Sequence, residues 1–294
     1  MGVLDQYRAA GETSHHIAAL IQRGSRVLIT HGNGPQVGFI LLRSEKSRDI
    51  LHQVPMDSCV ADTQGAIGYQ IEQTLLNELH SLKIERQIAT VVTQVVVDRD
   101  DPAFARPTKP IGPFFTREQA LLHQREDGWV VSEVGERGWR RVVPSPKPLE
   151  IVEESVISTL LDRNIIVIAG GGGGIPVTRT AAGELRGCVA VIDKDAVSAM
   201  LASHLNAATL IISTNVDKVC LNFNKPEERE IDKMTIAEAR IYLSEGHFAP
   251  GSMRPKIEAA LYFLEHGGGN VIITQPHHLE AALAGAEGTH IVTE

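Results

Sequence analysis

The sequence predicts an α/β fold in which a largely parallel sheet is covered by helices on both faces. Segments with helical periodicity alternate with short apolar segments along most of the 294 residues. Continuous apolar runs such as residues 165–169 are typical of strands buried on both faces of a parallel sheet. A chain of this length can bury the large core that such a fold needs.

The expected elements follow in order along the chain. We expect helices over 13–23, 36–48, 59–82 and 149–162, a helix that begins near residue 193, and helices over 235–244 and 255–266. We expect strands over 26–30, 88–97, 165–169, 208–214 and 270–274. Thr235 and Glu238 have the spacing of a capping box, which supports a helix start at that point.

Residues 98–148 interrupt this alternation. They are rich in Pro, Gly, Arg and Trp, with the stretches "PTKPIGPFF", "EDGWVV" and "WRRVVPSPKP". This composition favours a protruding arm or small lid with a β-hairpin over a linker between independent domains. We therefore expect a single domain over residues 1–294, with the lid inserted into it.

Composition and charge argue against several classes of protein. The apolar content of 43% and charged content of 22% are those of a soluble globular protein. A net charge of −8 and an aromatic content of 4% argue against a nucleic-acid partner. No apolar run approaches the roughly 20 residues of a membrane span. The 3 cysteines lack a repeated spacing and the N-terminus lacks targeting features, so we expect a cytoplasmic protein.

The histidines do not suggest a metal site. No Cys/His cluster has the spacing of a zinc site. The adjacent pairs His15–His16 and His277–His278 are too close in sequence to share one face of a helix. The sequence therefore predicts no metal ligands.

The segment "THGNGPQVG" follows a predicted strand directly. Gly32, Asn33 and Gly34 form a turn that leads into a helix N-terminus, where free N–H groups and the helix dipole favour an anion. A simple strand-to-helix turn is the alternative for any single G-x-G.

The run Gly170–Gly174 ends another predicted strand. It is neither a Walker P-loop nor a G-x-G-x-x-G that opens a helix, because Ile175, Pro176 and Val177 continue an extended chain. A backbone nest near phosphate and a flexible surface loop are both compatible with the run. Its buried flanks favour the close approach of a bulky, anionic group.

Two further segments contain charged residues at predicted helix starts. In "VIDKD", Asp193 is a candidate N-cap, and Lys194 and Asp195 follow it. In "GSMRPK", Lys256 lies in an opening helical turn, which is unfavourable for a cation unless an anion is also present. Each segment taken alone is also compatible with solvated surface residues.

Taken together, several segments resemble the carbamate kinases of the amino-acid kinase family. They are "THGNGPQVG", "QGAIGY", "DPAFARPTKPIGPF", "RRVVPSPKP", "GGGGIPV", "AVIDKD", "GHFAPGSM" followed by "PK", and "EGTHIV". They occur in family order from about Asp5 to the end of the chain. The resemblance implies an open three-layer αβα sandwich with a mainly parallel sheet and a small lid.

The resemblance also implies an activity. It implies reversible phosphoryl transfer between MgATP and carbamate, with Mg²⁺ carried by the nucleotide, in a homodimer. The N-terminal half, about residues 1–150, would bind carbamate, and the C-terminal half, about residues 151–294, would bind ATP or ADP. In such a transfer, positioning and charge neutralisation do most of the catalysis.

Roles for individual residues follow from the resemblance in the same way. Gly32, Asn33 and Gly34 would hold the acceptor, and Lys109 and Lys194 would stabilise the transferring group. Asp195 would orient Lys194. The implied nucleotide and phosphate contacts are Gly171, Gly172, Gly173, Gly174, Asn215, Asp217, Met253 and Lys256.

The chain departs from the family pattern in a few places. Family members open with a strand that ends in A-L-G-G-N-A, and Met1 falls after that point. A central strand with about five buried side chains, at roughly 1.5–3 kcal/mol each, is comparable with the whole stability of a domain. We therefore expect a misassigned start or a truncated chain. Asn215 replaces the first Asp of the T-D-V-D motif, and Arg254 stands where Gly is common.

Two alternatives stay open. The first is a kinase for another small acid, such as an amino acid or its N-acetyl derivative, and the lid segment "PTKPIGPF" argues against it. The second is an inactive or regulatory nucleotide-binding protein, which Asn215 and the missing G-G-N segment favour.

Overall fold

The structure is a computed structural model that describes residues 2–294, in which helices and strands alternate. The first half contains α1 (Val3–Gln22), β1 (Leu28–Ile29), α2 (Gly34–Lys46), α3 (Met56–Ser81), β2 (Ile88–Thr90), β3 (Gln94–Val97), α4 (Pro102–Ala105), β4 (Lys109–Phe115), α5 (Arg117–Glu126), β5 (Val130–Glu133), the 3₁₀ turn η1 (Gly135–Arg137), β6 (Trp139–Val143) and β7 (Pro148–Ile151). The second half contains α6 (Glu154–Asp162), β8 (Ile166–Ile168), η2 (Gly171–Gly173), β9 (Ile175–Arg179), β10 (Leu185–Gly187), α7 (Lys194–His204), β11 (Thr209–Ser213), β12 (Val219–Leu221), β13 (Arg229–Ile231), β14 (Lys233–Thr235), α8 (Ile236–Ser244), α9 (Met253–Glu265), β15 (Asn270–Thr274), η3 (Pro276–His278), α10 (Leu279–Leu283) and β16 (Thr289–Val292). Within residues 2–294, no helix combines the length and the apolar character needed to cross a membrane.

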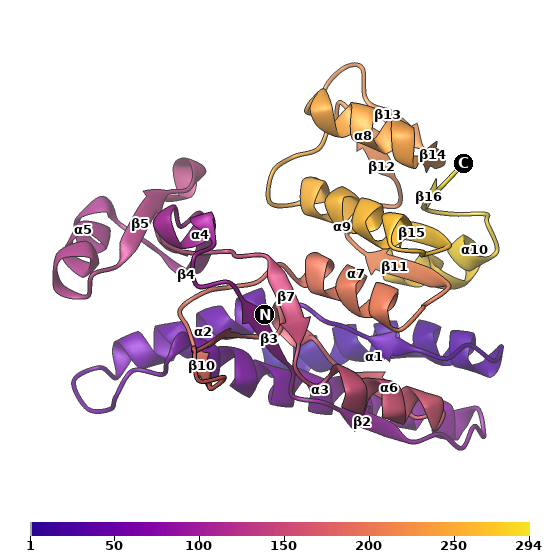
Figure 1. Cartoon of the computed structure of the whole chain (residues 1–294), viewed down its shortest axis with the longest axis horizontal. Coiled ribbons are helices and arrows are strands. Elements are labelled where there is room, and N and C mark those ends of the chain that lie inside the picture. Colours follow the sequence, from indigo (N-terminus) through magenta and orange to yellow (C-terminus); the bar gives the residue numbers. More distant parts are fainter. Residues whose placement is uncertain (1) are drawn as a thin grey trace.

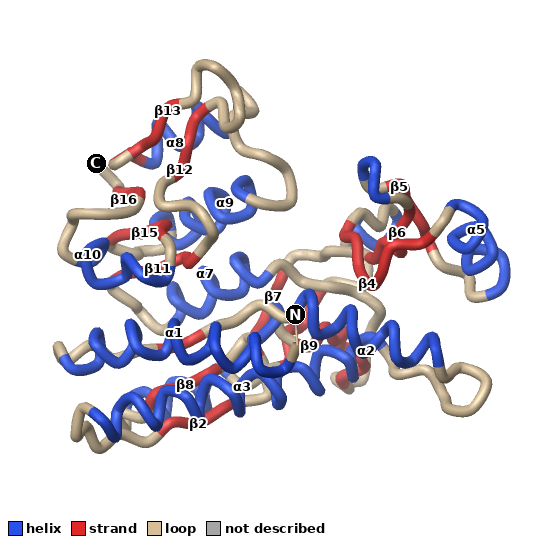
Figure 2. Tube along the Cα trace, turned by 180° about the vertical axis from the view of Figure 1, so that it is seen from behind, coloured by secondary structure: helices blue, strands red, loops and turns tan. Residues whose placement is uncertain are grey.

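Strand β8 shows how the N-terminal half is layered. β1 and β2 pair with it in parallel, one on each side. Ile166 and Ile168 pack with α1 and α3, whereas Val167 packs with α6 and α7. Because successive side chains of a strand point to opposite faces, helices cover both faces of this sheet, as Figures 1 and 2 show. The predicted α/β sandwich is confirmed.

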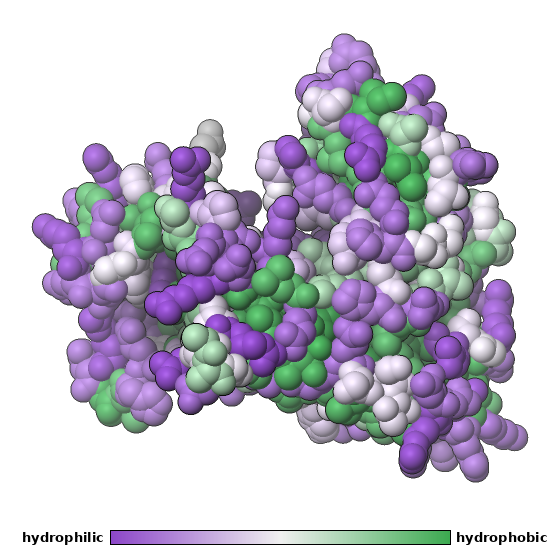
Figure 3. Space-filling view, viewed as in Figure 1, coloured by the Kyte–Doolittle hydropathy of each residue, from purple (hydrophilic) through white to green (hydrophobic). Residues whose placement is uncertain are grey.

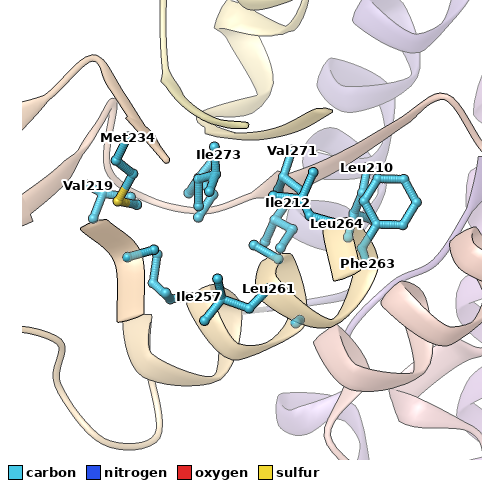
Figure 4. Packing of buried hydrophobic residues seen from close by; sticks show 14 of the residues in the cluster. Leu210, Ile212, Val219, Met234, Ile257, Leu261, Phe263, Leu264, Val271 and Ile273 are labelled. Carbon is cyan, nitrogen blue, oxygen red and sulfur yellow. The ribbon is translucent and has the colours of Figure 1, made fainter. Parts of the chain in front are cut away.

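The C-terminal half has a sheet and a core of its own. Its strand order is β11-β15-β16-β14, with β11–β15 and β14–β16 parallel and β15–β16 antiparallel. Figure 4 shows apolar side chains of β11 and β15 packed against α9, with Phe263 fully buried. On the other face, Ile211 of β11 packs against a cluster that includes Leu279 of α10. This half therefore also has helices on both faces.

The single strand expected over 88–97 is in fact two strands, β2 and β3, in different sheets. The Gln64 side chain of α3 accepts a hydrogen bond from the Thr93 N–H (2.8 Å) and donates one to the Thr93 carbonyl (3.2 Å). The Thr93 N–H therefore bonds to a side chain instead of a strand, whereas the Thr93 carbonyl also accepts a hydrogen bond from the Ile175 N–H of β9 at 2.8 Å. Beyond it, β3 pairs in parallel with β9 and antiparallel with β7.

Two predicted boundaries also differ from the structure. Helix α1 begins at Val3 rather than near Thr13, because Val3 and Leu4 are exposed and give no buried apolar stripe for periodicity to detect. The helix expected over 149–162 begins only at Glu154. The residues before it form β7, which pairs with β3.

The small sheet of β4, β5 and β6 stands apart from the main sheets at one end of the molecule (Figure 1). It is antiparallel, so the predicted hairpin carries a third strand. The His123 ring of α5 stacks on Trp129, with ring centroids 4.2 Å apart. Arg48, which follows α2, pairs with Asp127 at 3.0 Å and so ties the small sheet to the N-terminal half. Its role as a lid stays a prediction.

Gly65 and Gly68 lie on the same helix, α3, in different surroundings. A methyl group at Gly68 would collide with the Thr90 side chain of β2, whereas a methyl group at Gly65 would have no atom within 4 Å. We predict that Gly68→Ala lowers the free energy of unfolding by about 1–3 kcal/mol through overpacking. Gly65→Ala should raise it by about 0.5–1 kcal/mol, since Ala loses less backbone entropy. Urea unfolding of both variants tests this, and equal effects would contradict close helix–sheet packing.

Candidate functional site

The first turns of α7 and α9 meet at one buried carboxylate, Asp195. Its Oδ1 accepts a hydrogen bond from Lys194 Nζ at 2.5 Å, and its Oδ2 accepts one from Lys256 Nζ at 2.9 Å. Lys194 begins α7, and Lys256 lies in the first turn of α9. The anion that the sequence requires near Lys256 is thus present, and Asp195 provides it. One carboxylate holds two lysines from separate helices.

Burial and charge act in opposite directions on this cluster. Burial alone would raise the pKa of Asp195, but Lys194 and Lys256 hold that pKa below its ordinary value. Burial lowers the pKa of Lys256, and the nearby Lys194 adds to this, while Asp195 opposes the shift. The ionised form of Asp195 therefore depends on both ammonium groups.

Asp193 links the same helix to the small sheet. It is the N-cap of α7, where its Oδ1 accepts a hydrogen bond from the Asp195 N–H at 2.9 Å. Its Oδ2 accepts a hydrogen bond from Lys109 Nζ at 3.1 Å. The three lysines outnumber the two carboxylates, and two helix N-termini lie beside them. This arrangement favours an anionic ligand.

The loop between β1 and α2 lies against Lys194. A methyl group at Gly32 would be 3.6 Å from Lys194 Cδ and Cε, so the lysine stem crosses this residue. Asn33 is buried, and its amide donates to Thr63 Oγ1 at 2.9 Å. Gly34 begins α2 and is exposed. The structure therefore brings the predicted acceptor loop next to a predicted catalytic lysine.

The glycine run has a different setting from the one that the sequence suggested. Gly171, Gly172, Gly173 and Gly174 are buried. A methyl group at Gly172 would collide with Asn33, and one at Gly173 would collide with the Ile192 carbonyl. Gly172 and Gly173 also have φ values of 67° and 91°, which disfavour other residues. The close neighbours are parts of the protein itself, and contact with phosphate stays a prediction.

The remaining predicted nucleotide residues lie in the C-terminal half. Asn215 and Asp217 are exposed in the loop after β11, where Gln275 Nε2 donates a hydrogen bond to Asp217 Oδ1 at 3.0 Å. Met253 begins α9 and packs against the C-terminal core. The structure thus groups them with β11 and α9, and their contacts with a nucleotide stay predictions.

A cavity of about 520 Å³ lies between α2 and the small sheet. Its walls include Asn33, Gly34, Lys109, Arg140 and Val191. The Arg140 guanidinium donates two hydrogen bonds to the Gly112 carbonyl, at 2.8 and 3.1 Å, which fix it in this wall. On the face in Figure 3, the molecule is hollowed between the small sheet and the C-terminal half.

Sequence reasoning assigned no role to Arg140. The residue lies within the quoted segment "RRVVPSPKP", but nothing in the spacing of that segment separates a site arginine from a surface one. Its proximity to Lys109 depends on the antiparallel pairing of β4 with β6, which brings the two strands side by side.

The shifted pKa of Asp195 predicts part of the acid sensitivity of the fold. Since its folded pKa lies below the ordinary value of 3.8, its ionised form stabilises the chain above that value. This contribution is lost as the pH falls through the folded pKa. We predict that wild type loses more unfolding free energy than Asp195→Asn between pH 5 and roughly pH 2–3. Urea unfolding at several pH values measures this, and parallel pH profiles would contradict it.

Comparisons with known proteins agree with this architecture. The profile of the amino acid kinase family matches residues 5–275. The chain is 51% identical over 269 residues to the carbamate kinase-like protein YahI of Escherichia coli. This alignment covers 90% of this chain and 85% of the relative. It is 45% identical over 293 residues to a carbamate kinase of Thermococcus kodakarensis. That alignment covers 99% of this chain and 93% of the relative.

A solved structure supports the same assignment. The carbamate kinase from Giardia lamblia bound to AMP-PNP superimposes with a TM-score of 0.93 at 40% identity, over 99% of this chain and 92% of that one. The family profile, the sequence relatives and this structure each cover most of the chain. The chain therefore belongs to the amino acid kinase family.

Proposed function

We propose that the chain transfers a phosphoryl group reversibly between MgATP and carbamate. In one direction carbamoyl phosphate and ADP give ATP and carbamate, and the carbamate then breaks down to ammonia and carbon dioxide. The chain is a phosphotransferase of the kinase type, in keeping with its carbamate kinase relatives. The observation that carries the proposal is the fixing of Lys194 and Lys256 by one buried carboxylate, beside the Gly32–Gly34 loop.

The proposed mechanism depends on placing charge around the phosphoryl group. In-line transfer asks little covalent chemistry of the protein, because stabilising charge on the phosphoryl oxygens supplies most of the catalysis. Asp195 orients Lys194, and Asp193 orients Lys109. The two lysines would approach the transferring group from α7 and from the small sheet, while Lys256 would contact the nucleotide phosphates.

The acceptor would occupy the cavity between α2 and the small sheet. Asn33 and Gly34 lie on one wall of this cavity, and Lys109 and Arg140 lie on another. Carbamate and carbamoyl phosphate are anions, so the two cations suit either ligand. The Arg140 side chain is already held by the Gly112 carbonyl, which limits the rotamer freedom it loses on binding.

The carboxylates at the site do not suit a resident Mg²⁺. Both oxygens of Asp195 accept from lysines, and both oxygens of Asp193 are engaged by Lys109 and by a backbone N–H. Mg²⁺ is usually held by one or two carboxylates together with phosphates. We therefore infer that Mg²⁺ belongs to the nucleotide substrate.

A kinase for a related small acid is a second candidate. One relative, at 51% identity, is named only carbamate kinase-like. The alternative of an inactive nucleotide-binding protein is not favoured, because relatives named as carbamate kinases match at 45–49% identity over most of the chain.

The substitution Lys194→Ala tests the proposal. We predict a fall in kcat of about 10²–10³-fold, since a donor aimed at transition-state charge is lost. The assay couples ATP formation from ADP and carbamoyl phosphate to a dehydrogenase signal. Lys46→Ala, which removes an exposed lysine of α2, is the matched control and should keep wild-type kcat.

Two results would contradict the proposal. Unchanged kcat in Lys194→Ala would show that Lys194 does not take part in phosphoryl transfer. Wild-type protein that binds ADP but forms no ATP from carbamoyl phosphate would exclude carbamate as the acceptor. Parallel assays with ATP and other small carboxylic acids would then test the second candidate.

A further inference from the structure

Two imidazoles and one carboxylate lie together at the C-terminal ends of β11 and β15. Asp217 lies in the loop after β11, and His277 and His278 lie in η3, which follows β15. The two strands pair in parallel, so their ends reach the same edge of the sheet. Each of the three residues offers one atom that can bind a metal ion. These three atoms all lie within 4.8 Å of one another.

One separation within this cluster matches that of two ligands of a single ion, and the others lie within 4.8 Å. His278 Nε2 lies 3.3 Å from Asp217 Oδ1. Two ligands that bind zinc at about 2.0–2.2 Å in a tetrahedron lie roughly 3.3–3.5 Å apart. The His277 and His278 rings are adjacent, with centroids 4.1 Å apart. His277 is exposed, so its side chain can rotate to complete the coordination.

A neighbouring amide orients the carboxylate of the cluster. Gln275 Nε2 donates to Asp217 Oδ1 at 3.0 Å, which holds the carboxylate toward η3. His278 Nδ1 faces Glu287 Oε2 at 3.9 Å, on the side of the ring away from Asp217. Metal-ligating histidines commonly donate their second ring N–H to a carboxylate, and Glu287 lies near this position without forming a hydrogen bond.

We propose that Asp217, His277 and His278 bind one divalent transition-metal ion, with Zn²⁺ as the reference ion. Two imidazoles and one carboxylate form a donor set that suits zinc and its neighbours in the first transition row better than Mg²⁺. Water would complete the coordination, because the cluster is open to solvent. The bound ion would cross-link the loop after β11 to η3. The cluster contains none of the lysines to which phosphoryl transfer is assigned, but it shares Asp217 with the implied nucleotide contacts.

Zn²⁺ titration of the metal-free full chain, without a histidine tag, tests the site. A chromophoric chelator competes for the ion, and we expect one Zn²⁺ per chain with no displacement by excess Mg²⁺. The double variant His277→Gln/His278→Gln should lose affinity by more than about ten-fold, since even the loss of an orienting neighbour costs 10–100-fold. Zn²⁺ should also raise the Tm of wild type but not of this variant.

The double variant His52→Gln/His80→Gln is the matched control. It removes two exposed imidazoles, one in the loop before α3 and one on α3, and should bind Zn²⁺ as wild type does. Unchanged affinity in His277→Gln/His278→Gln, or the absence of stoichiometric binding in wild type, would overturn the proposal. So would an equal loss in the control, because it would indicate scattered binding to surface histidines. Circular dichroism of both variants confirms that they are folded.

Discussion

The carboxylate of Asp195 is buried between two ammonium groups, and the arrangement of the site depends on this contact. Removing a charge from water costs several kcal/mol, and the cost is offset only when the partners are close and well oriented. Lys194 and Lys256 meet this requirement from two different helices. This interaction therefore holds the first turns of α7 and α9 together. It also orients the two lysine side chains. Asp193 extends the arrangement to Lys109 and the small sheet.

Close backbone packing supports this polar centre. The run Gly171–Gly174 passes between Asn33, the Ile192 carbonyl and Val95, where no larger residue fits. Gln64 Nε2 donates to both the Thr93 and Gly171 carbonyls, which fixes the run relative to α3. The predicted acceptor loop, the glycine run and the start of α7 are therefore packed directly against one another. Glycine is needed here because protein atoms, rather than a ligand alone, approach the backbone.

Much of the fold could be predicted from local pattern. The apolar run of β8 indicated a strand buried on both faces, and its alternating contacts with α1 and α6 confirm this. The break between β2 and β3 could not be predicted, since it depends on an amide that comes from α3. The early start of α1 escaped detection because its first turns are exposed.

The candidate site was predicted as separate segments rather than as a geometry. Lys194, Asp195 and Lys256 each stood at an expected helix start, but only the structure shows that they share one carboxylate. Arg140 was missed, because its proximity to Lys109 depends on the pairing of β4 with β6. The sequence implied a nucleotide role for Asp217 and predicted no metal ligand at His277–His278, since their proximity to Asp217 depends on strands that are distant in sequence. The roles of the glycine run, of Asn215 and of Met253, and the homodimer, stay predictions.

A double-mutant cycle between Asp195 and Lys256 tests the central claim most directly. The measured quantity is the free energy of unfolding at neutral pH for wild type, Asp195→Asn, Lys256→Met and the double variant. If the two charges stabilise each other in the folded chain, the double variant loses less than the sum of the single losses. The expected coupling is about 1–3 kcal/mol. Losses that add to within roughly 0.3–0.5 kcal/mol would contradict the account.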